Sequence, residues 1–191
     1  MKFDTSYSHG RVKYGLLRGN EIIVFIKAGA GGSIPGYRGK YLLMACRIRE
    51  RLGATVICAS NPDCEHQTDE DEMTIRKVAD DAGFSDYELR LIGVSDGAYQ
   101  ILSLATRFRQ SKVFLGINMS FVDPDRLTGK LSALPHIRKI LVYGTEDDDY
   151  SVISPVIKTV ECDNLVFRSV CGADHQFTGK LDEFIGLADL I

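Results

Sequence analysis

A serine between two glycines marks the stretch of the chain with the clearest chemistry. Residues 93–97 read Gly-Val-Ser-Asp-Gly and fit the pattern G-x-S-x-G, with Ser95 at the centre. Small residues on both sides of a serine let a strand and a helix approach each other around a sharp turn. Such a turn lifts the hydroxyl group above a sheet edge, where it can attack an acyl carbonyl carbon. The pattern therefore predicts a catalytic nucleophile.

The residues around this turn have the periodicity that the pattern needs. Residues 88–92 are mostly apolar and predict a strand, and Ala98, Ile101 and Leu102 recur at helical spacing after the turn. An ordinary strand-to-helix loop with two glycines is the competing interpretation. The position of Ser95 between a strand and a helix favours the nucleophile.

A serine hydroxyl needs a general base, and His175 is the predicted one. It lies in the loop Gly-Ala-Asp-His, which follows a strand expected at residues 164–170. The carboxyl ends of parallel strands meet at one edge of a sheet, so this loop should lie near Ser95. His136 precedes its strand and is expected at the opposite edge.

The base in turn needs a carboxylate that orients its ring. Asp147 is the predicted acid because it follows the strand expected at residues 139–143 and the glycine that ends it. Asp148 and Asp149 are alternatives in the same acidic run. Asp123, after the preceding strand, is the runner-up location.

The negative oxygen that forms during acyl transfer needs backbone N–H donors. Asp96 supplies one as the residue after the nucleophile, and Ala30 supplies the other from the loop 28–33, Ala-Gly-Ala-Gly-Gly-Ser. A phosphate-binding loop is the competing interpretation of these glycines. However, no G-K-[ST] follows the loop, and Pro35 lies near the third glycine position of the dinucleotide pattern. We therefore expect no nucleotide cofactor.

The elements that position these residues alternate along the chain, which predicts an α/β fold: a mostly parallel central sheet flanked by helices on both faces, in three layers. Strands are expected at 11–18, 21–27, 54–59, 88–92, 112–119, 139–143 and 164–170. Helices are expected at 35–52, 73–82, 98–104, within 120–138, at 151–161 and at 178–191. Gly19-Asn20 suggests a hairpin between the first two strands. Residues 1–10 carry little signal, and residues 60–72 read as an acidic loop.

Composition narrows the class of protein. The 191 residues are 45% hydrophobic and 26% charged, which suits a single globular domain spanning 1–191. A net charge of −3 gives no footprint for nucleic acid, and no apolar run is long enough to span a membrane. The polar N-terminus and five cysteines, an odd number, favour a reducing cytoplasm. No metal-binding spacing is evident, and nothing indicates the oligomeric state.

The order of Ser95, Asp147 and His175 over strand-end loops resembles the α/β-hydrolase superfamily. The loop 28–33 looks like that family's H-G-x-G-G segment, residues 93–98 like its nucleophile turn, and Gly-Thr-Glu-Asp and Ala-Asp-His like its acid and histidine loops. One departure is Ala28, which stands where the family has the loop histidine. The resemblance implies an acyl-enzyme mechanism without a cofactor or metal.

The resemblance also implies a substrate-covering cap after Met119, but only residues 120–138 are available there. We therefore expect a small intracellular serine hydrolase without a cap domain, acting on ester or thioester bonds of a small or carrier-bound acyl substrate. The candidate pocket residues are Gly29, Gly31, Tyr37, Phe121, Tyr150 and Phe177. An acyltransferase with the same triad and a non-catalytic binding protein of this fold are the alternative functions.

Overall fold

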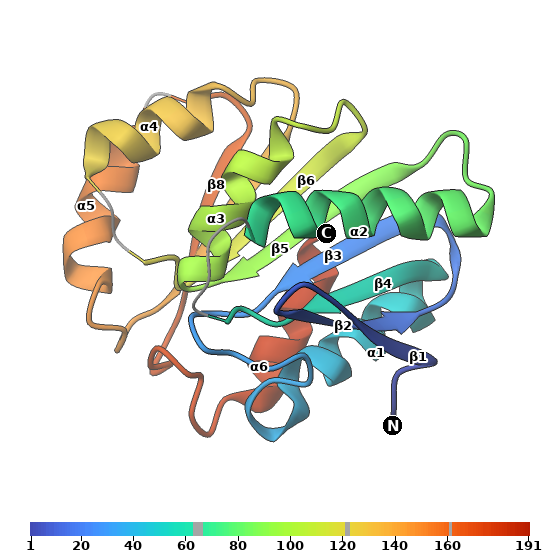
Figure 1. Ribbon diagram of the computed structural model, residues 1–191. Coiled ribbons are helices and arrows are strands. Elements are labelled where there is room, and N and C mark those ends of the chain that lie inside the picture. Colours follow the sequence, from blue (N-terminus) through green and yellow to red (C-terminus); the bar gives the residue numbers. More distant parts are fainter. Residues whose placement is uncertain (63–66, 121–122, 161) are drawn as a thin grey trace.

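The computed structural model describes residues 1–62, 67–120, 123–160 and 162–191. In these ranges, eight strands form one sheet in the order β1-β2-β4-β3-β5-β6-β7-β8 (Figure 1). The strands from β4 to β8 pair in parallel, whereas β1 and β2 are antiparallel to their neighbours. Their bounds are Thr5–His9, Val12–Leu17, Asn20–Lys27, Ala54–Ala59, Glu88–Val94, Ser111–Ile117, Arg138–Gly144 and Leu165–Val170 for β1 to β8.

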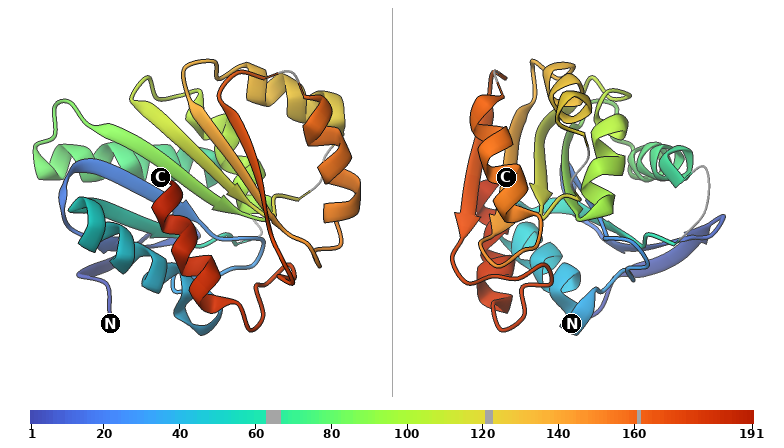
Figure 2. Two further views of the ribbon diagram at one scale, coloured as in Figure 1. Left: turned by 180° about the vertical axis from the view of Figure 1, so that it is seen from behind. Right: turned by 90° about the vertical axis from the view of Figure 1, so that its left-hand side faces the viewer.

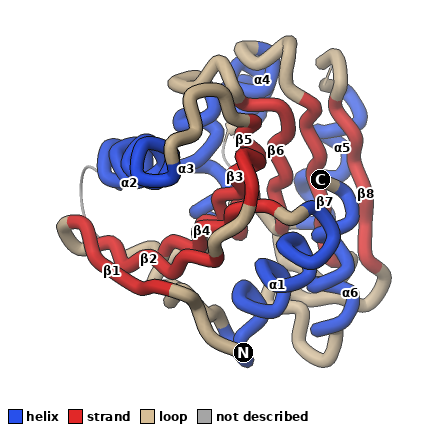
Figure 3. Tube along the Cα trace, turned by 90° about the vertical axis from the view of Figure 1, so that its right-hand side faces the viewer, coloured by secondary structure: helices blue, strands red, loops and turns tan. Residues whose placement is uncertain are grey.

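Helices cover both faces of this sheet. One face packs against α2 (Gln67–Ala82), α3 (Asp96–Ala105), α4 (Pro124–Ser132) and α5 (Tyr150–Thr159), and the other against α1 (Lys40–Leu52) and α6 (Leu181–Gly186). Figure 2 shows α1 and α6 side by side on their face, and Figure 3 shows the helices on either side of the strands. Short 3₁₀ turns, η1 (Tyr37–Gly39) and η2 (Leu187–Leu190), precede α1 and follow α6. The predicted three-layer α/β fold is therefore confirmed.

The central strands are apolar on both faces because both faces are covered. Every residue of β4 is buried, and the last five residues of β3 are buried as well. A strand that packs on two layers needs a continuous apolar run instead of alternation. This explains why the parallel strands were the easiest elements to predict.

The expected hairpin between residues 11–18 and 21–27 is wrong. Strand β2 pairs instead with β1 on one side and with β4 on the other, both antiparallel. After the Gly19-Asn20 turn, β3 runs on the far side of β4. Asn20 anchors this path by donating from its side chain to the carbonyl oxygen of Leu52, at 2.9 Å.

Two further expectations at the N-terminal half need correction. Residues 5–9, within the stretch of little signal, form the edge strand β1. Helix α2 begins at Gln67 instead of residue 73, so the described part of the expected acidic loop is partly helical. Asp69 and Glu70 lie in its first turn, where carboxylates are favourable next to the positive end of the helix dipole.

Candidate active site

Ser95 lies in the turn between β5 and α3, in a backbone conformation that few side chains adopt. Its φ is 54° and its ψ is −130°. A Cβ atom at Gly93 would lie 2.3 Å from the Cα atom of Ala98, and one at Gly97 would lie 2.1 Å from the carbonyl oxygen of Ala28. Both distances are too short for any side chain. The two glycines therefore allow the strand and the helix to close tightly around the serine.

His175 lies between the hydroxyl group of Ser95 and the carboxylate of Asp147. Its Nε2 atom is 2.9 Å from the Oγ atom of Ser95, and its Nδ1 atom is 2.6 Å from the Oδ2 atom of Asp147. The Asp147 side chain is 1% exposed, whereas the His175 side chain is 37% exposed. An imidazole that donates from Nδ1 to the carboxylate leaves Nε2 free to accept a proton from the serine hydroxyl.

Among the acidic residues at 146–149, Asp147 makes the contact to the histidine. Its other carboxylate oxygen accepts a hydrogen bond from the backbone N–H of Asp149, at 2.9 Å. Asp148 is exposed. Asp123 caps the N-terminus of α4 by accepting hydrogen bonds from two backbone N–H groups, each at 3.1 Å. The structure thus brings together Asp147, His175 and Ser95 and gives Asp123 a different, structural contact.

Asn118 ties the loops of the acid and the base together, and the sequence analysis missed it. Its Nδ2 atom donates to the carbonyl oxygens of Asp174 and His175, both at 3.1 Å, and its Oδ1 atom accepts from the N–H of Gly144, at 2.8 Å. The residue is buried and has a φ of 41°, a region that asparagine enters more readily than most residues. An asparagine at the end of a predicted strand, at the reactive edge of the sheet, was the available signal.

The glycine-rich loop after β3 passes directly beside the serine. A Cβ atom at Gly29 would lie 3.1 Å from the Cβ atom of Ser95, so a larger residue would crowd the serine. The loop is fixed to the end of β4, because the N–H of Gly31 donates to the carbonyl oxygen of Asn61 at 2.7 Å. In return, the N–H of Asn61 donates to the carbonyl oxygen of Gly32 at 2.9 Å. These bonds hold the backbone close to the reacting hydroxyl.

The backbone N–H groups of Ala30 and Asp96 are free to bind a ligand. Within the described ranges, neither donates a hydrogen bond to another residue. Ala30 lines the cleft beside Ser95, and Asp96 is the first residue of α3, where N–H groups have no partner inside the helix. Two such donors near the nucleophile can hold a negatively charged oxygen.

A cleft of about 480 Å³ opens over Ser95 and His175. Its size is in the range of pockets that hold small molecules. Glycines and polar groups dominate its wall, so it is not a pocket for a large apolar ligand. The lining residues are Gly29, Ala30, Gly31, Gly32, Ser33, Gly36, Tyr37, Lys40, Tyr41, Val94, Ser95, His175 and Gln176.

Only some of the candidate pocket residues line the cleft. Gly29, Gly31 and Tyr37 line the cleft, and Tyr37 is 61% exposed. Tyr150 stacks on Phe167 instead, with ring centroids 6.5 Å apart. The candidate residue Phe177 is buried in the core against α6, and Phe121 lies outside the described residues.

Lys40 is a second residue of the cleft that the sequence analysis missed. It is the first residue of α1, is 3% exposed and lines the cleft together with Gln176. Its Nζ atom donates to the carbonyl oxygen of Gln176 at 3.1 Å and to Oε1 of the same residue at 3.4 Å. Burial lowers the pKa of Lys40 to about 8. The sequence signal was weak because a lysine at a helix start is usually exposed.

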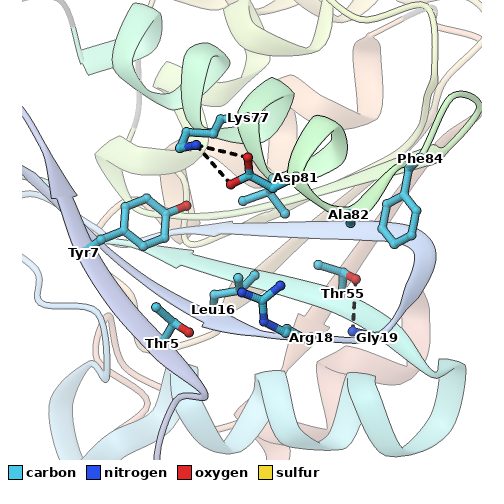
Figure 4. A pocket seen from close by; sticks show the side chains of 11 residues that line it. Thr5, Tyr7, Leu16, Arg18, Gly19, Thr55, Lys77, Asp81, Ala82 and Phe84 are labelled. Atoms are coloured by element: carbon cyan, nitrogen blue, oxygen red, sulfur yellow. Dashed lines mark hydrogen bonds and ion pairs between the residues drawn. The ribbon is translucent and has the colours of Figure 1, made fainter.

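A separate cavity of about 400 Å³ lies between the β1-β2 strands and α2 (Figure 4). Leu16, Val78 and Phe84 contribute apolar surface, and an ion pair between Lys77 and Asp81 lies on one side. The residues that line it include no histidine, cysteine or serine. Ser95 and His175 line the other cleft.

The described ranges hold no group of three or more histidine, cysteine, aspartate or glutamate side chains placed to bind a metal ion. In the same ranges, no helix combines the length and the apolar character needed to cross a membrane.

Comparisons with known proteins find solved structures that share the architecture of this chain. No protein-family model and no curated protein sequence matches the chain. Among solved structures, an α/β serine hydrolase homologue from Coxiella burnetii superposes with a TM-score of 0.68 at 15% identity, covering 98% of this chain and 97% of that one. Est1E from Butyrivibrio proteoclasticus superposes with a TM-score of 0.70 at 13% identity, covering 97% and 96%. The esterase domain of a Rhodothermus marinus protein superposes with a TM-score of 0.68 at 13% identity, covering 97% of this chain and 94% of that one.

This chain has the α/β-hydrolase fold. The fold explains why loops that are far apart in sequence, after β3, β5, β7 and β8, meet at one edge of the sheet. Identities this low establish the fold and leave the chemistry to the residues themselves. In this α/β-hydrolase fold, those residues are a hydroxyl group, an imidazole and a buried carboxylate in hydrogen-bond contact.

Proposed function

We propose that the protein is a small serine hydrolase that cleaves ester or thioester bonds through an acyl-enzyme. The observation that carries this proposal is the unbroken chain of contacts from Ser95 through His175 to Asp147, at 2.9 Å and 2.6 Å. A hydroxyl group can act as a nucleophile, an imidazole as a general base and a carboxylate as the group that orients the imidazole. The esterases among the solved structures of the same fold support the proposal.

In the proposed mechanism, Ser95 attacks the acyl carbonyl carbon while Nε2 of His175 takes the hydroxyl proton. Asp147 holds the imidazole ring in the required tautomer and stabilises its positive charge. The N–H groups of Ala30 and Asp96 bind the negative oxygen of the tetrahedral intermediate. His175 then returns the proton to the leaving group, and water that it activates releases the acyl group.

Hydrolysis is favoured over acyl transfer because the site is open. The His175 side chain is 37% exposed, so water can reach an acyl group on Ser95. Between β6 and β7 the described residues hold only α4, and its Leu127 and Leu131 are buried in the core. This supports a chain without a cap domain. An acyltransferase would need walls that exclude water from the acyl-enzyme.

We also propose a cytoplasmic location. The four cysteines in the described ranges, Cys46, Cys58, Cys162 and Cys171, are all free thiols. Proteins of oxidising compartments usually pair such cysteines.

The proposal is tested with p-nitrophenyl esters of acetic, butyric and octanoic acid. Hydrolysis by the wild type is expected, with the short esters preferred because glycines and polar side chains make up much of the cleft wall. Ser95→Ala should lower kcat by at least about three orders of magnitude. Ser85→Ala, at an exposed serine before β5, is the matched control and should leave kcat unchanged. Equal activity of wild type and Ser95→Ala would overturn the proposal.

A further inference from the structure

Lys40 is a basic residue of the cleft that also holds Ser95 and His175. Among the described residues that line it, none is acidic and none other is a lysine or an arginine. The whole chain carries a net charge of −3, so this positive site stands out against a negative protein. The cleft is therefore electrostatically suited to a negatively charged molecule.

The groups in direct contact with the ammonium group of Lys40 are neutral, and Asp174 acts on it from beyond ion-pair distance. It donates two hydrogen bonds to Gln176, to the backbone carbonyl oxygen and to Oε1. Its Nζ atom also lies 4.8 Å from the ring centroid of Phe184 and 5.5 Å from that of Tyr41. In the described part of the chain, no carboxylate lies within ion-pair distance of it. An ammonium group has three N–H donors, and Gln176 takes two of them.

This position is unfavourable for a positive charge. Lys40 is 3% exposed and begins α1, where the helix dipole is positive. The chain deals differently with Lys27, which is fully buried, because Asp71 lies 2.8 Å from its Nζ atom. A buried cation without a counter-ion is costly, and such groups occur where a ligand supplies the missing charge.

We propose that Lys40 binds a carboxylate of the substrate, so that the cleft prefers esters or thioesters that carry a negative charge. The inference rests on the proposed function, because it names the substrate class of the same site. The third N–H donor of the ammonium group would meet the carboxylate, and Ser95 would act on the ester bond of the same molecule. Lys40 is then the residue that determines specificity and not a catalytic group.

The test compares matched pairs of esters that differ only in charge. In one series the carboxylate is on the acyl side: monoethyl succinate, glutarate and adipate against ethyl butyrate, pentanoate and hexanoate. In the other it is on the leaving group: 4-acetoxybenzoate against phenyl acetate. We expect wild-type kcat/KM to be at least about tenfold higher for the charged member of one series, about the value of one well-placed ion pair. The series that shows the preference identifies which side carries the carboxylate.

Substitution of the lysine separates specificity from structure. Lys40→Met and Lys40→Gln should each lower kcat/KM at least about tenfold more for the charged esters than for the neutral esters, so that the preference for charged esters disappears. Lys112→Met, at an exposed lysine at the start of β6, is the control and should keep the preference. Equal kcat/KM for charged and neutral esters in both wild-type series would overturn the inference. An equal loss on charged and neutral esters in the Lys40 variants would assign the lysine a structural role and would also overturn it.

A binding measurement keeps this inference distinguishable from the proposed function. Ser95→Ala protein is mixed with monoethyl adipate, and binding is followed by saturation-transfer NMR, which needs no turnover. Binding to Ser95→Ala protein that is lost in the double variant Ser95→Ala/Lys40→Met would support the anion site even if no ester were hydrolysed. If the wild type hydrolyses neutral esters but Ser95→Ala protein does not bind monoethyl adipate, the anion site is overturned and the hydrolase proposal stands.

Discussion

The side-chain amide of Asn118 donates a hydrogen bond to the backbone carbonyl oxygen of His175, at 3.1 Å. The same side chain accepts a hydrogen bond from Gly144, at the start of the loop that carries the acid. One buried amide thus fixes the separation between the two loops that hold the base and the carboxylate. A small shift of either loop would misalign the proton transfer.

Asn118→Ala should therefore lower activity more than its effect on folding explains. We expect a loss of about 1–3 kcal/mol in the free energy of unfolding, because the N–H of Gly144 loses its partner in the core. In folded protein, kcat should fall about 10- to 100-fold with little change in KM. Asn164→Ala is the matched control, since Asn164 also has a positive φ, of 59°, and donates to a backbone carbonyl oxygen, but at the opposite edge. If both variants kept wild-type kcat, Asn118 would have no positioning role.

Asp147→Asn should keep the fold and lose the reaction. An amide at this position can donate a hydrogen bond to Nδ1 of His175 and so stabilise the wrong tautomer. We expect kcat on p-nitrophenyl butyrate to fall by about four orders of magnitude, as for other triads. Asp148→Asn removes the neighbouring exposed carboxylate and should leave kcat unchanged. If Asp148→Asn lost activity and Asp147→Asn kept it, Asp148 would be the residue that orients His175.

Gly97→Ala tests how tightly α3 packs against the loop after β3, beside Ser95. The new Cβ atom would lie 2.1 Å from the carbonyl oxygen of Ala28, so the helix or the loop must move. The free energy of unfolding in urea should fall by at least about 2 kcal/mol. Gly129→Ala is the control, because no atom lies within 4 Å of its added Cβ atom, and in α4 it should stabilise by about 0.5–1 kcal/mol. Two equally stable variants would show that the turn is looser than described.

The preference for charged esters should depend on pH through Lys40. Burial lowers the pKa of this lysine to about 8, and the nearby Asp174 acts in the opposite direction. The ammonium form exists below that pKa, so the ratio of kcat/KM for charged and neutral esters should be highest near about pH 7 and fall towards about pH 9. Taking the ratio cancels any effect of pH that is common to both esters. A ratio that stays constant over this range would contradict the assignment.

Elements whose signals are local were predictable from the sequence. The strands β3, β4, β5 and β6 are mostly apolar runs with clear boundaries. The turn around Ser95 follows from the spacing of Gly93 and Gly97. A parallel sheet then brings the strand-end loops to one edge, which is why Asp147 and His175 could be named before the structure was known.

Features that depend on long-range pairing were not predictable. Strand β1 reads Thr-Ser-Tyr-Ser-His and lies at the sheet edge, so few of its side chains need to be apolar. One of the two antiparallel partners of β2 is β4, whose residues lie some forty positions away, and a turn dipeptide carries no information about such a partner. The hydrogen bonds from Asn118 to His175 and from Lys40 to Gln176 likewise join segments that lie more than 50 residues apart.

Active-site labelling tests the central claim most directly. Purified protein is treated with a fluorophosphonate, and the modified residue is located by mass spectrometry. The account predicts one adduct, on Ser95, that is lost in Ser95→Ala and strongly reduced in His175→Ala, while Ser120, whose Oγ atom lies 3.2 Å from that of Ser95, stays unmodified. Folded wild-type protein without an adduct, or with an adduct that does not depend on His175, would contradict an activated serine at this site.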